Sequence, residues 1–471
     1  MRIAEHPILD FERGKQITIY LEERPIRAYE GDTIAAALFA GGIREFRVSE
    51  KKQRPRGFYC AIGKCSSCLM EVNGIPNVRT CITLAKDGMR IKEQKGWGGL
   101  TPSKKKPKIE FLPVRETDVL VIGGGPAGLR AALACGRTGV NVTLVDENPY
   151  LGGQLLKQTH KFFGSEKQWA GVRGIRIGEE LTDEVRRSER IEVMTSSSAV
   201  GIYERRIVGI YKRGEKLKKI HPKGIIVATG AQERMIMFEN NDLPGVYGAG
   251  GVQTLMNQYG VKPGDDLLMV GAGNVGLIVS YQLLQAGVNV KAVVEAMPKV
   301  GGYFVHAAKL MRQGVPILIS HTVLRVEGRN RVERAVIARV DGKGIVKGSE
   351  KTLKVDAVAL AVGLSPDYRL PDQAGCEIKF VPKLGGWAAL RDENLETSKK
   401  GIWVAGDASG VEEATTAMLE GEIAGYSASL RLGFGGKAER KRIEEAKKEL
   451  EELRKGPFYV HVREGLKEVG R

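Results

Sequence analysis

Near the start of the chain, apolar and polar residues alternate in short stretches, which is typical of strands. Residues 17–30 predict two strands joined by a turn. Apolar residues at helical spacing then predict a helix that Asp32 or Thr33 can cap. Residues 69–72 predict a further strand, followed by an Asn-Gly hairpin turn. We therefore expect residues 1–95 to form a small domain of strands around one helix.

From residue 117 the pattern changes to buried strands that alternate with helices. Residues 118–148 predict a strand, a glycine turn, a helix and a second strand, and residues 265–297 repeat this unit. Two copies in one chain indicate an α/β fold with two Rossmann-like nucleotide-binding domains.

Two charged stretches flank this part of the chain. Residues 101–108, TPSKKKPK, combine prolines with lysines and have no apolar period, so they predict a solvated linker. Residues 437–455 predict a charged helix with a narrow apolar stripe of Ile443, Ala446, Leu450 and Leu453. We expect this stripe to pack on its own domain, and docking on a partner is the alternative.

Composition limits the class of protein. The chain has 471 residues, a net charge of +17 and 42% hydrophobic residues. No apolar run approaches the roughly 20 residues of a membrane span, and the start lacks the apolar stretch of a signal peptide, so we expect a soluble, cytoplasmic protein. The basic residues are scattered without an aromatic platform, which argues against nucleic-acid binding. The charge fits either a thermophilic source or an acidic partner subunit.

Four of the six cysteines lie close together at spacing C-x4-C-x2-C-x12-C: Cys60, Cys65, Cys68 and Cys81. The first three follow the spacing of plant-type [2Fe–2S] centres, and Gly63 lets the loop wrap tightly. The sequence therefore predicts a [2Fe–2S] cluster and one-electron transfer. A structural zinc site and a loop that holds no metal are the alternatives.

The first strand–helix unit carries a G-x-G-x-x-G turn directly after its strand. The predicted binding residues there are Gly123, Gly125, Pro126, Ala127 and Gly128. Such a turn lets the backbone approach a pyrophosphate at a helix N-terminus. An acidic residue after the next strand, Asp146 with Glu147 as the backup, can bond ribose hydroxyls.

The second unit has the same signature. Its predicted binding residues are Gly271, Gly273, Asn274, Gly276 and Glu295. A carboxylate at Glu295 would bond the 2′-hydroxyl of NAD and repel a 2′-phosphate, so NAD(H) is preferred over NADP(H). A fold element that binds no nicotinamide, or that holds another adenine nucleotide, is the alternative.

Further strand ends make the region of residues 115–432 resemble the two-dinucleotide flavoproteins that include thioredoxin reductases. These are the GGQ run with Gly153 and Gln154, the ATG end with Thr229 and Gly230, and the Gly-Asp end with Gly406 and Asp407. The resemblance implies FAD, with Asp407 bonding the ribityl chain. A helix starting near Glu412 would point its positive end at the flavin. Unlike disulfide reductases, the chain has no Cys-x-x-Cys pair in these regions.

Together with a β-grasp ferredoxin-like N-terminus, residues 10–432 resemble the alpha subunits of heterotetrameric sarcosine oxidases and dye-linked L-proline dehydrogenase complexes. The stretches that carry this are RGFYC at residues 56–60, GGQLL at 152–156, LPGV at 243–246 and VQTL at 252–255. The resemblance implies a hetero-oligomer in which a separate FAD-containing beta subunit oxidises the amine. The C-terminal folate-binding half and the second cysteine cluster of some relatives are missing, so tetrahydrofolate chemistry is not expected.

We therefore expect a ferredoxin-like domain followed by an FAD domain with an inserted NAD domain. The predicted segments are 1–95 (ferredoxin-like), 96–114 (basic linker), 115–238 and 359–432 (FAD-binding), 239–358 (NAD-binding-like) and 433–471 (helical tail).

The expected function is electron transfer between flavin, iron–sulfur and NAD(H) or another acceptor. The chain would serve a dehydrogenase complex for a secondary amine such as proline, hydroxyproline or sarcosine. A stand-alone NADH:acceptor oxidoreductase and a non-catalytic nucleotide-binding scaffold are the alternatives. We nominate no catalytic side chain, because hydride transfer depends on the placement of rings and the six histidines are scattered.

Overall fold

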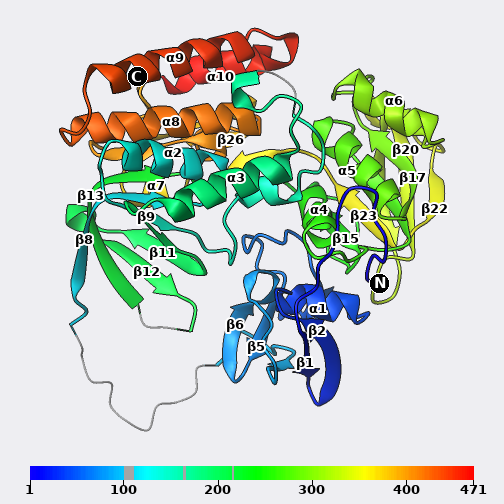
Figure 1. Ribbon diagram of the computed structural model, residues 1–471. Helices are drawn as coiled ribbons and strands as arrows, with labels where there is room; N and C mark the ends of the chain where they lie inside the picture. Colours follow the sequence, from blue (N-terminus) through cyan, green and yellow to red (C-terminus); the bar gives the residue numbers. More distant parts are fainter. Residues whose placement is uncertain (100–110, 163–165, 215–216, 471) are drawn as a thin grey trace. The chain divides into compact units, whose positions relative to one another are not determined.

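The computed structural model describes residues 1–99, 111–162, 166–214 and 217–470. The chain forms two compact units, each built from two separate stretches (Figure 1). Unit 1 comprises Met1–Lys106 and Glu233–Gly363, and unit 2 comprises Pro107–Gln232 and Leu364–Arg471. The expected linker at residues 101–108 lies outside the described residues.

The N-terminal part of unit 1 is a five-stranded sheet with one helix, as a β-grasp domain requires. The sheet order is β2-β1-β7-β5-β6, with β1 (Gln16–Leu21), β2 (Arg24–Tyr29), β5 (Leu69–Val72), β6 (Ile75–Arg79) and β7 (Arg90–Lys92). Helix α1 (Ile34–Ala40) is capped by the Thr33 hydroxyl, which accepts a hydrogen bond from the Ala36 amide. The short pair β3 (Arg47–Val48) and β4 (Pro55–Arg56) precedes the cysteine loop.

The rest of unit 1 is the second predicted nucleotide-binding fold. Its parallel sheet has the order β15-β23-β16-β17-β18, with β15 (Val246–Gly248), β16 (Asp266–Val270), β17 (Asn289–Glu295), β18 (Ile317–Ile319) and β23 (Ala357–Leu360). Helices α4 (Ala249–Asn257), α5 (Asn274–Gln285) and α6 (Phe304–Arg312) accompany it. A separate antiparallel sheet contains β19 (His321–Glu327), β20 (Arg334–Asp341), β21 (Gly344–Ile345) and β22 (Lys351–Lys354).

One hydrophobic core spans both stretches of unit 1. Phe39 of α1 packs against Phe58 and against Tyr247 of β15, with ring centroids 5.8 and 5.9 Å apart. A Cβ atom at Gly251 of α4 would lie 2.1 Å from the carbonyl oxygen of Tyr59, so only glycine permits this approach. The Arg54 guanidinium also donates hydrogen bonds of 2.7 and 3.0 Å to the carboxylate of Asp242. The ferredoxin-like part and the nucleotide-binding part therefore fold against each other.

Unit 2 is the first predicted nucleotide-binding fold. Its sheet has the order β10-β9-β8-β13-β12-β11, and β27 also pairs with β13. The strands are β8 (Val114–Ile122), β9 (Val142–Val145), β10 (Ile191–Met194), β11 (Ser197–Ile202), β12 (Val208–Lys212), β13 (Leu217–Val227) and β27 (Ile402–Val404). The helices α2 (Pro126–Arg137), α3 (Gly174–Arg187) and α8 (Ala414–Arg431) cover it (Figure 1). Helix α8 begins two residues later than the position near Glu412 that the sequence suggests.

The C-terminal tail packs on unit 2. Helices α9 (Lys437–Leu453) and α10 (Val460–Val469) follow α8 (Figure 1). Ile443, Ala446 and Leu450 of the predicted stripe are buried in the core of unit 2, and Leu453 packs against it. The expected packing of this helix on its own domain is confirmed. The smaller elements are α7 (Arg369–Gln373), β14 (Ala231–Glu233), β24 (Leu364–Pro366), β25 (Ile378–Val381) and β26 (Gly386–Ala389).

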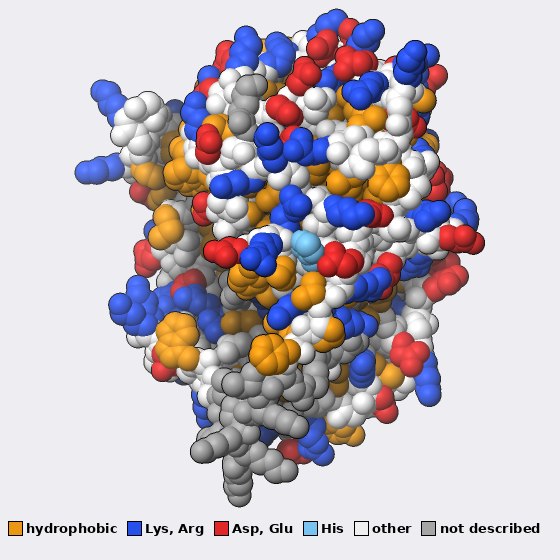
Figure 2. Space-filling model, turned by 90° about the vertical axis from the view of Figure 1, so that its left-hand side faces the viewer, with side chains coloured by type: hydrophobic (Ala, Val, Ile, Leu, Met, Phe, Trp, Pro, Cys, Tyr) orange, Lys and Arg blue, Asp and Glu red, His pale blue; other side chains and the backbone are white. Residues whose placement is uncertain are grey.

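One face of the molecule shows the scattered charge that the sequence suggests. On the face shown in Figure 2, Lys and Arg side chains are interspersed with Asp and Glu side chains. Within the described ranges, no helix combines the length and apolar character needed to cross a membrane.

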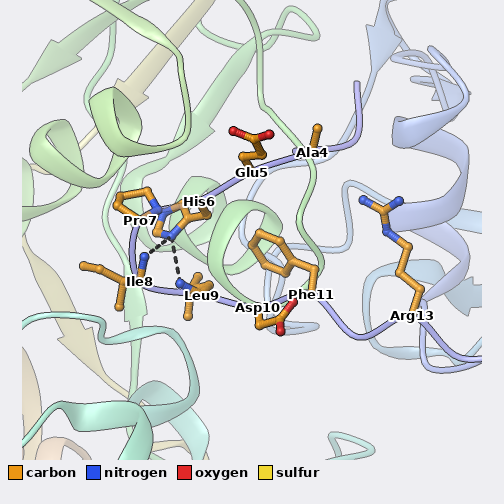
Figure 3. Close-up of a pocket in the computed structure, with 9 residues that line it drawn as sticks. All are labelled: Ala4, Glu5, His6, Pro7, Ile8, Leu9, Asp10, Phe11 and Arg13. Atoms are coloured by element: carbon orange, nitrogen blue, oxygen red, sulfur yellow. Dashed lines mark hydrogen bonds between the residues drawn. The ribbon is translucent and has the colours of Figure 1, made fainter.

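His6 has a structural role. In the pocket lined by residues 4–11 and Arg13, its Nδ1 accepts hydrogen bonds from the amides of Ile8 and Leu9, at 3.2 and 3.1 Å (Figure 3). Burial lowers the pKa of His6, which favours the neutral imidazole, and the two hydrogen bonds that it accepts hold a turn.

Candidate functional site

The four clustered cysteines lie on two segments of unit 1. Cys60, Cys65 and Cys68 belong to the loop between β4 and β5, and Cys81 lies in the 3₁₀ turn Thr80–Ile82 that follows β6. The hairpin at Asn73-Gly74 returns the chain as predicted, and the Thr80 hydroxyl donates a 2.7 Å hydrogen bond to the carbonyl of Cys68. Of the four thiols, Cys65 is exposed and the other three are buried.

The cysteine loop is tightly wound. Ala61 and Ser66 have φ values of 59° and 57°, a left-handed conformation that costs energy for residues other than glycine. Gly63 has a φ of 73°, and a Cβ atom there would lie 2.7 Å from the Ile82 side chain. The three turns together bring the sulfur-bearing residues around the same small volume.

The thiols interact in neighbouring pairs. Hydrogen bonds from Cys65 and Cys81 lower the pKa of Cys60, and a hydrogen bond from Cys81 lowers the pKa of Cys68. The amides of Ile62 and Cys65 also donate to the Cys60 sulfur. The same hydrogen bonds, together with burial, raise the pKa values of Cys65 and Cys81. The lowered pKa values and the amide donors therefore favour a thiolate, the form that binds iron, at Cys60 and Cys68.

The chemistry of these four thiols suits a [2Fe–2S] cluster. In the described part of the chain, no group of three or more His, Cys, Asp or Glu side chains is arranged to hold a metal ion. Hydrogen bonds nevertheless link Cys60 to Cys65 and Cys81, and Cys68 to Cys81, so the four thiols are neighbours, and four cysteine sulfurs are the ligand set of a [2Fe–2S] cluster. The residues present therefore fit a [2Fe–2S] cluster.

In unit 2, the glycine turn after β8 has the geometry of a nucleotide cradle. Gly123 has a φ of 110°, and a Cβ atom there would lie 2.2 Å from the Ala228 carbonyl oxygen. A Cβ atom at Gly128 would lie 1.7 Å from the carbonyl oxygen of Gly123, so helix and turn touch. At Gly125 the nearest atom would be 3.9 Å away, which leaves open space for a ligand to approach the backbone. Pro126 and Ala127 begin α2 beside this space.

Asp146 holds the turn in place. Its carboxylate accepts hydrogen bonds from the amides of Gly124 (2.6 Å) and Asn148 (2.7 Å). Burial nevertheless raises the pKa of Asp146. Glu147, the expected backup, is half-buried. The carboxylate lies where the ribose of a nucleotide on the turn is expected.

The later strand ends converge on the same turn. A Cβ atom at Gly153 would lie 2.8 Å from the Gly125 Cα, and one at Gly406 would lie 2.8 Å from the Ala127 Cβ. Gln154 lies beside Gly153 and is exposed. The Thr229 hydroxyl donates to the Asp367 carbonyl at 3.2 Å, and the Gly230 carbonyl accepts from the Asp367 amide. Unit 2 thus brings the predicted flavin residues together.

Asp407 has the most strongly shifted pKa among the predicted residues of this site. Its side chain is half-buried, and the partial loss of water around it, together with the charges of Glu412 and Glu420, raises its pKa to about 7. Its Oδ1 accepts a 3.2 Å hydrogen bond from the amide of Glu412. A ligand hydroxyl that donates a hydrogen bond to this carboxylate would offset the cost of burying its charge.

The second turn, in unit 1, repeats the geometry of the first. Gly271 has a φ of 105°, and Cβ atoms at Gly271 and Gly276 would lie 2.3 and 2.0 Å from carbonyl oxygens. Gly273 has open space on its Cβ side. The Glu295 carboxylate accepts hydrogen bonds from the Ala272 amide (2.8 Å) and the Met297 amide (2.9 Å), as Asp146 does in unit 2.

Two further glycines at the second turn were not predicted from the sequence. A Cβ atom at Gly302 would lie 2.8 Å from the amide nitrogen of Asn274, and Gly301 lies beside it. Asn274, a predicted binding residue, uses its side-chain oxygen to accept a 2.8 Å hydrogen bond from the Tyr303 amide. The available signal was spacing, because Gly152-Gly153 and Gly301-Gly302 each begin six residues after the acidic residue.

Comparison with known proteins identifies both parts of the chain. Residues 117–421 match the family model described as pyridine nucleotide-disulphide oxidoreductase, and residues 14–96 match a 2Fe-2S iron-sulfur cluster binding domain. The first family implies FAD and the second implies a [2Fe–2S] cluster, and the cradle and the thiol pairs fit these groups.

Relatives of known name support the resemblance to sarcosine oxidase and L-proline dehydrogenase. The chain is 27% identical to the alpha subunit of sarcosine oxidase from Rhizobium meliloti (strain 1021), over 92% of this chain and 47% of that protein. It is 27% identical to an opine oxidase subunit from Rhizobium meliloti, over 67% of this chain and 63% of that protein.

A solved structure also matches. The crystal structure of L-proline dehydrogenase from P. horikoshii has a TM-score of 0.70 and 28% identity, with 94% of this chain and 79% of that chain covered. The chain spans about half the length of the curated sarcosine oxidase subunits that it matches. It belongs to the pyridine nucleotide-disulphide oxidoreductase family and carries an N-terminal 2Fe–2S ferredoxin-type domain.

Proposed function

We propose that this chain is the electron-transfer flavoprotein subunit of a complex that dehydrogenates a secondary amine. The observation that carries the proposal is one chain with a paired-thiol loop and a flavin cradle but no Cys-x-x-Cys dithiol in the nucleotide-binding regions of its sequence. The two remaining cysteines, Cys135 and Cys376, are buried and far apart in sequence. Bound FAD exchanges electron pairs and a [2Fe–2S] cluster exchanges single electrons.

The names of the relatives support the substrate class. Sarcosine oxidase, opine oxidase and L-proline dehydrogenase are among the proteins to which this chain is similar. Sarcosine and proline each carry a secondary amine, which loses two electrons on oxidation to an imine. We therefore propose a secondary amino acid such as proline, hydroxyproline or sarcosine as the substrate of the complex.

We further propose that the amine is oxidised on a separate, FAD-containing beta subunit. Two of the relatives are named as subunits, which supports a multi-subunit assembly. This chain would then hold its own FAD and iron–sulfur cluster in positions that let electrons leave the substrate-oxidising subunit.

The second turn is proposed to bind NAD(H). The Glu295 carboxylate at the end of β17 supports this choice, because its charge favours a ribose 2′-hydroxyl and opposes a 2′-phosphate. We expect NADH to bind at least about tenfold more tightly than NADPH. Equal affinity of the full-length chain for the two nucleotides would contradict this part of the proposal.

Co-purification tests the whole proposal. The tagged full-length chain, isolated from its native source, should carry flavin and iron and should bring with it a second flavin-containing subunit. The complex should reduce an artificial dye when a secondary amino acid is supplied, and the primary amine glycine should serve as the inactive control.

Two other outcomes would replace the proposal. Full turnover of the isolated chain with NADH and its physiological acceptor would favour a stand-alone oxidoreductase. A colourless preparation without flavin or iron would favour a scaffold.

A further inference from the structure

The C-terminal tail brings a buried cation to the flavin end of unit 2. Arg454 directly follows helix α9, whose apolar stripe anchors the tail in the core. A second anchor is the hydrogen bond from the Arg391 amide to the Val469 carbonyl, 3.0 Å long, at the end of α10. The position of Arg454 is therefore fixed from both ends of the tail.

Arg454 joins two buried carboxylates. Its guanidinium donates to both oxygens of Glu412, at 2.9 and 2.6 Å, and to Oε1 of Glu420 at 2.8 Å. The side-chain exposures of Arg454, Glu412 and Glu420 are 15%, 4% and 3%. Two carboxylates this deeply buried need a counter-charge, because an unpaired buried charge is strongly destabilising.

Both residues contact the Gly406-Asp407 segment, Glu420 through its carboxylate and Glu412 through its backbone amide. Glu420 Oε2 accepts hydrogen bonds from the Gly406 amide (3.0 Å) and the Ser409 hydroxyl (2.8 Å). The Glu412 amide donates to Asp407. Burial and the negative charges of Glu412 and Glu420 all oppose ionisation of Asp407. Within the described chain, the other cation that pairs with Glu420 is Arg391, at 3.3 Å.

We propose that Arg454 is a positioning residue of the FAD site: it neutralises Glu412 and Glu420, so that the Gly406-Asp407 segment keeps the geometry and charge with which Asp407 binds the ribityl chain. The proposal depends on FAD binding at Asp407, and it is independent of which amine the complex oxidises. It also gives the tail a role in cofactor binding.

FAD binding to the full-length chain tests the proposal. The dissociation constant is measured by equilibrium dialysis for the unmodified chain, for Arg454→Met and for the matched control Lys441→Met. Lys441 lies on α9, and its exposed side chain pairs with Glu445 at 3.8 Å on the same helix. We expect Arg454→Met to weaken FAD binding at least about tenfold and Lys441→Met to leave it within about twofold.

A second pair of variants separates charge balance from packing. The double variant Arg454→Met/Glu412→Gln removes one charge of each sign, so it should restore FAD affinity to within about threefold of the unmodified chain. The FAD affinity of Arg454→Lys should lie between those of the unmodified chain and Arg454→Met, because an ammonium does not form the two parallel hydrogen bonds that Arg454 makes to Glu412. If Arg454→Met does not fold, the FAD affinity of the double variant decides. A value within about threefold of the unmodified chain supports the proposal, and a larger loss overturns it.

The outcomes that overturn the proposal are distinct. If the unmodified chain binds no FAD, the proposal falls together with the FAD assignment. If it binds FAD and Arg454→Met binds as tightly as Lys441→Met, the proposal alone is wrong. A folded double variant that remains as weak as Arg454→Met also overturns it, because the loss would then come from packing.

Discussion

Asp407 shows how one half-buried carboxylate links ligand binding to stability. Its pKa is raised from 3.8 to about 7, mainly by burial. In the unfolded chain the carboxyl ionises near pH 4, whereas in the folded ligand-free chain it holds its proton up to about pH 7. Stability therefore falls as the pH rises between these values, by on the order of 4 kcal/mol if the full shift is expressed.

The variant Asp407→Asn tests this directly. Without a ligand, it should match the unmodified chain in thermal midpoint at pH 4 and exceed it at pH 8, because the asparagine is never ionised. Its FAD affinity should change in the opposite direction and decrease. Thermal melts across this pH range provide the measurement, with the exposed Asp372→Asn as control. Parallel pH curves for Asp407→Asn and the unmodified chain would contradict the assignment.

Two glycines of the first turn should separate folding from binding. In Gly128→Ala, the new Cβ would lie 1.7 Å from the Gly123 oxygen, so we expect a loss of about 1–3 kcal/mol or more in the free energy of unfolding. In Gly125→Ala the new Cβ points into open space, and the loss should stay below about 1 kcal/mol. FAD affinity should nevertheless drop in Gly125→Ala, because that space is where the pyrophosphate approaches.

Urea unfolding and FAD dialysis on both variants give the two readouts. A Gly125→Ala chain that binds FAD normally would show that the ligand does not pass over this residue.

Individual site residues were predictable to the extent that they belong to local motifs. The Gly123 and Gly271 turns and the acidic residues after the next strands follow from spacing alone. Gly301 and Gly302 were missed because a Gly-Gly pair is common, and only its place relative to Glu295 distinguishes it. Arg454 had no signal, because its partners Glu420 and Glu412 are 34 and 42 residues away in sequence and only the folded tail brings them together.

At the scale of elements, the cysteine loop combines strained turns with the paired thiols. The left-handed Ala61 and Ser66 persist because the surrounding loop fixes them. The strand–helix pattern predicted the flanking elements, and the cysteine spacing predicted the cluster. Neither could predict which thiols are buried, because that depends on packing against residues outside the loop.

Replacing one buried ligand should remove the cluster. A [2Fe–2S] cluster contributes about two iron atoms per chain and a visible absorbance. We expect Cys68→Ser to lose both. Cys376→Ser, a buried cysteine of unit 2 that contacts Thr397, should keep both. Iron analysis and absorbance spectra provide the measurement. Iron retained at the unmodified level in Cys68→Ser would contradict its role as a ligand.

At the scale of the whole molecule, each structural unit combines two stretches that are far apart in sequence. Hydrophobic periodicity identifies each strand and helix, but it does not say which segments share a core. The core of unit 1 joins residues from the first 91 positions with residues from 247 to 359. Each interface side chain, such as Phe39 or Tyr247, has an ordinary apolar pattern in its own element, so the shared core is visible only in three dimensions.

Tyr247 provides a test of this shared core. Its side chain is 1% exposed and contacts Phe39 and Phe58. Tyr247→Ala should lower the free energy of unfolding by about 3–5 kcal/mol. Amide hydrogen exchange should then accelerate in both α1 and β16, which belong to different stretches of unit 1. The exposed Tyr203→Ala in unit 2 is the control. Faster exchange in β16 alone would contradict cooperative folding of the two stretches.

The contact between Gly251 and Tyr59 has a consequence for engineering. Because the backbone next to Cys60 rests on the first turn of α4, the iron–sulfur segment is not a detachable module. Cutting it out would uncover apolar surface on both pieces, and transplanting it into another oxidoreductase would require a recipient helix with glycine at the matching position.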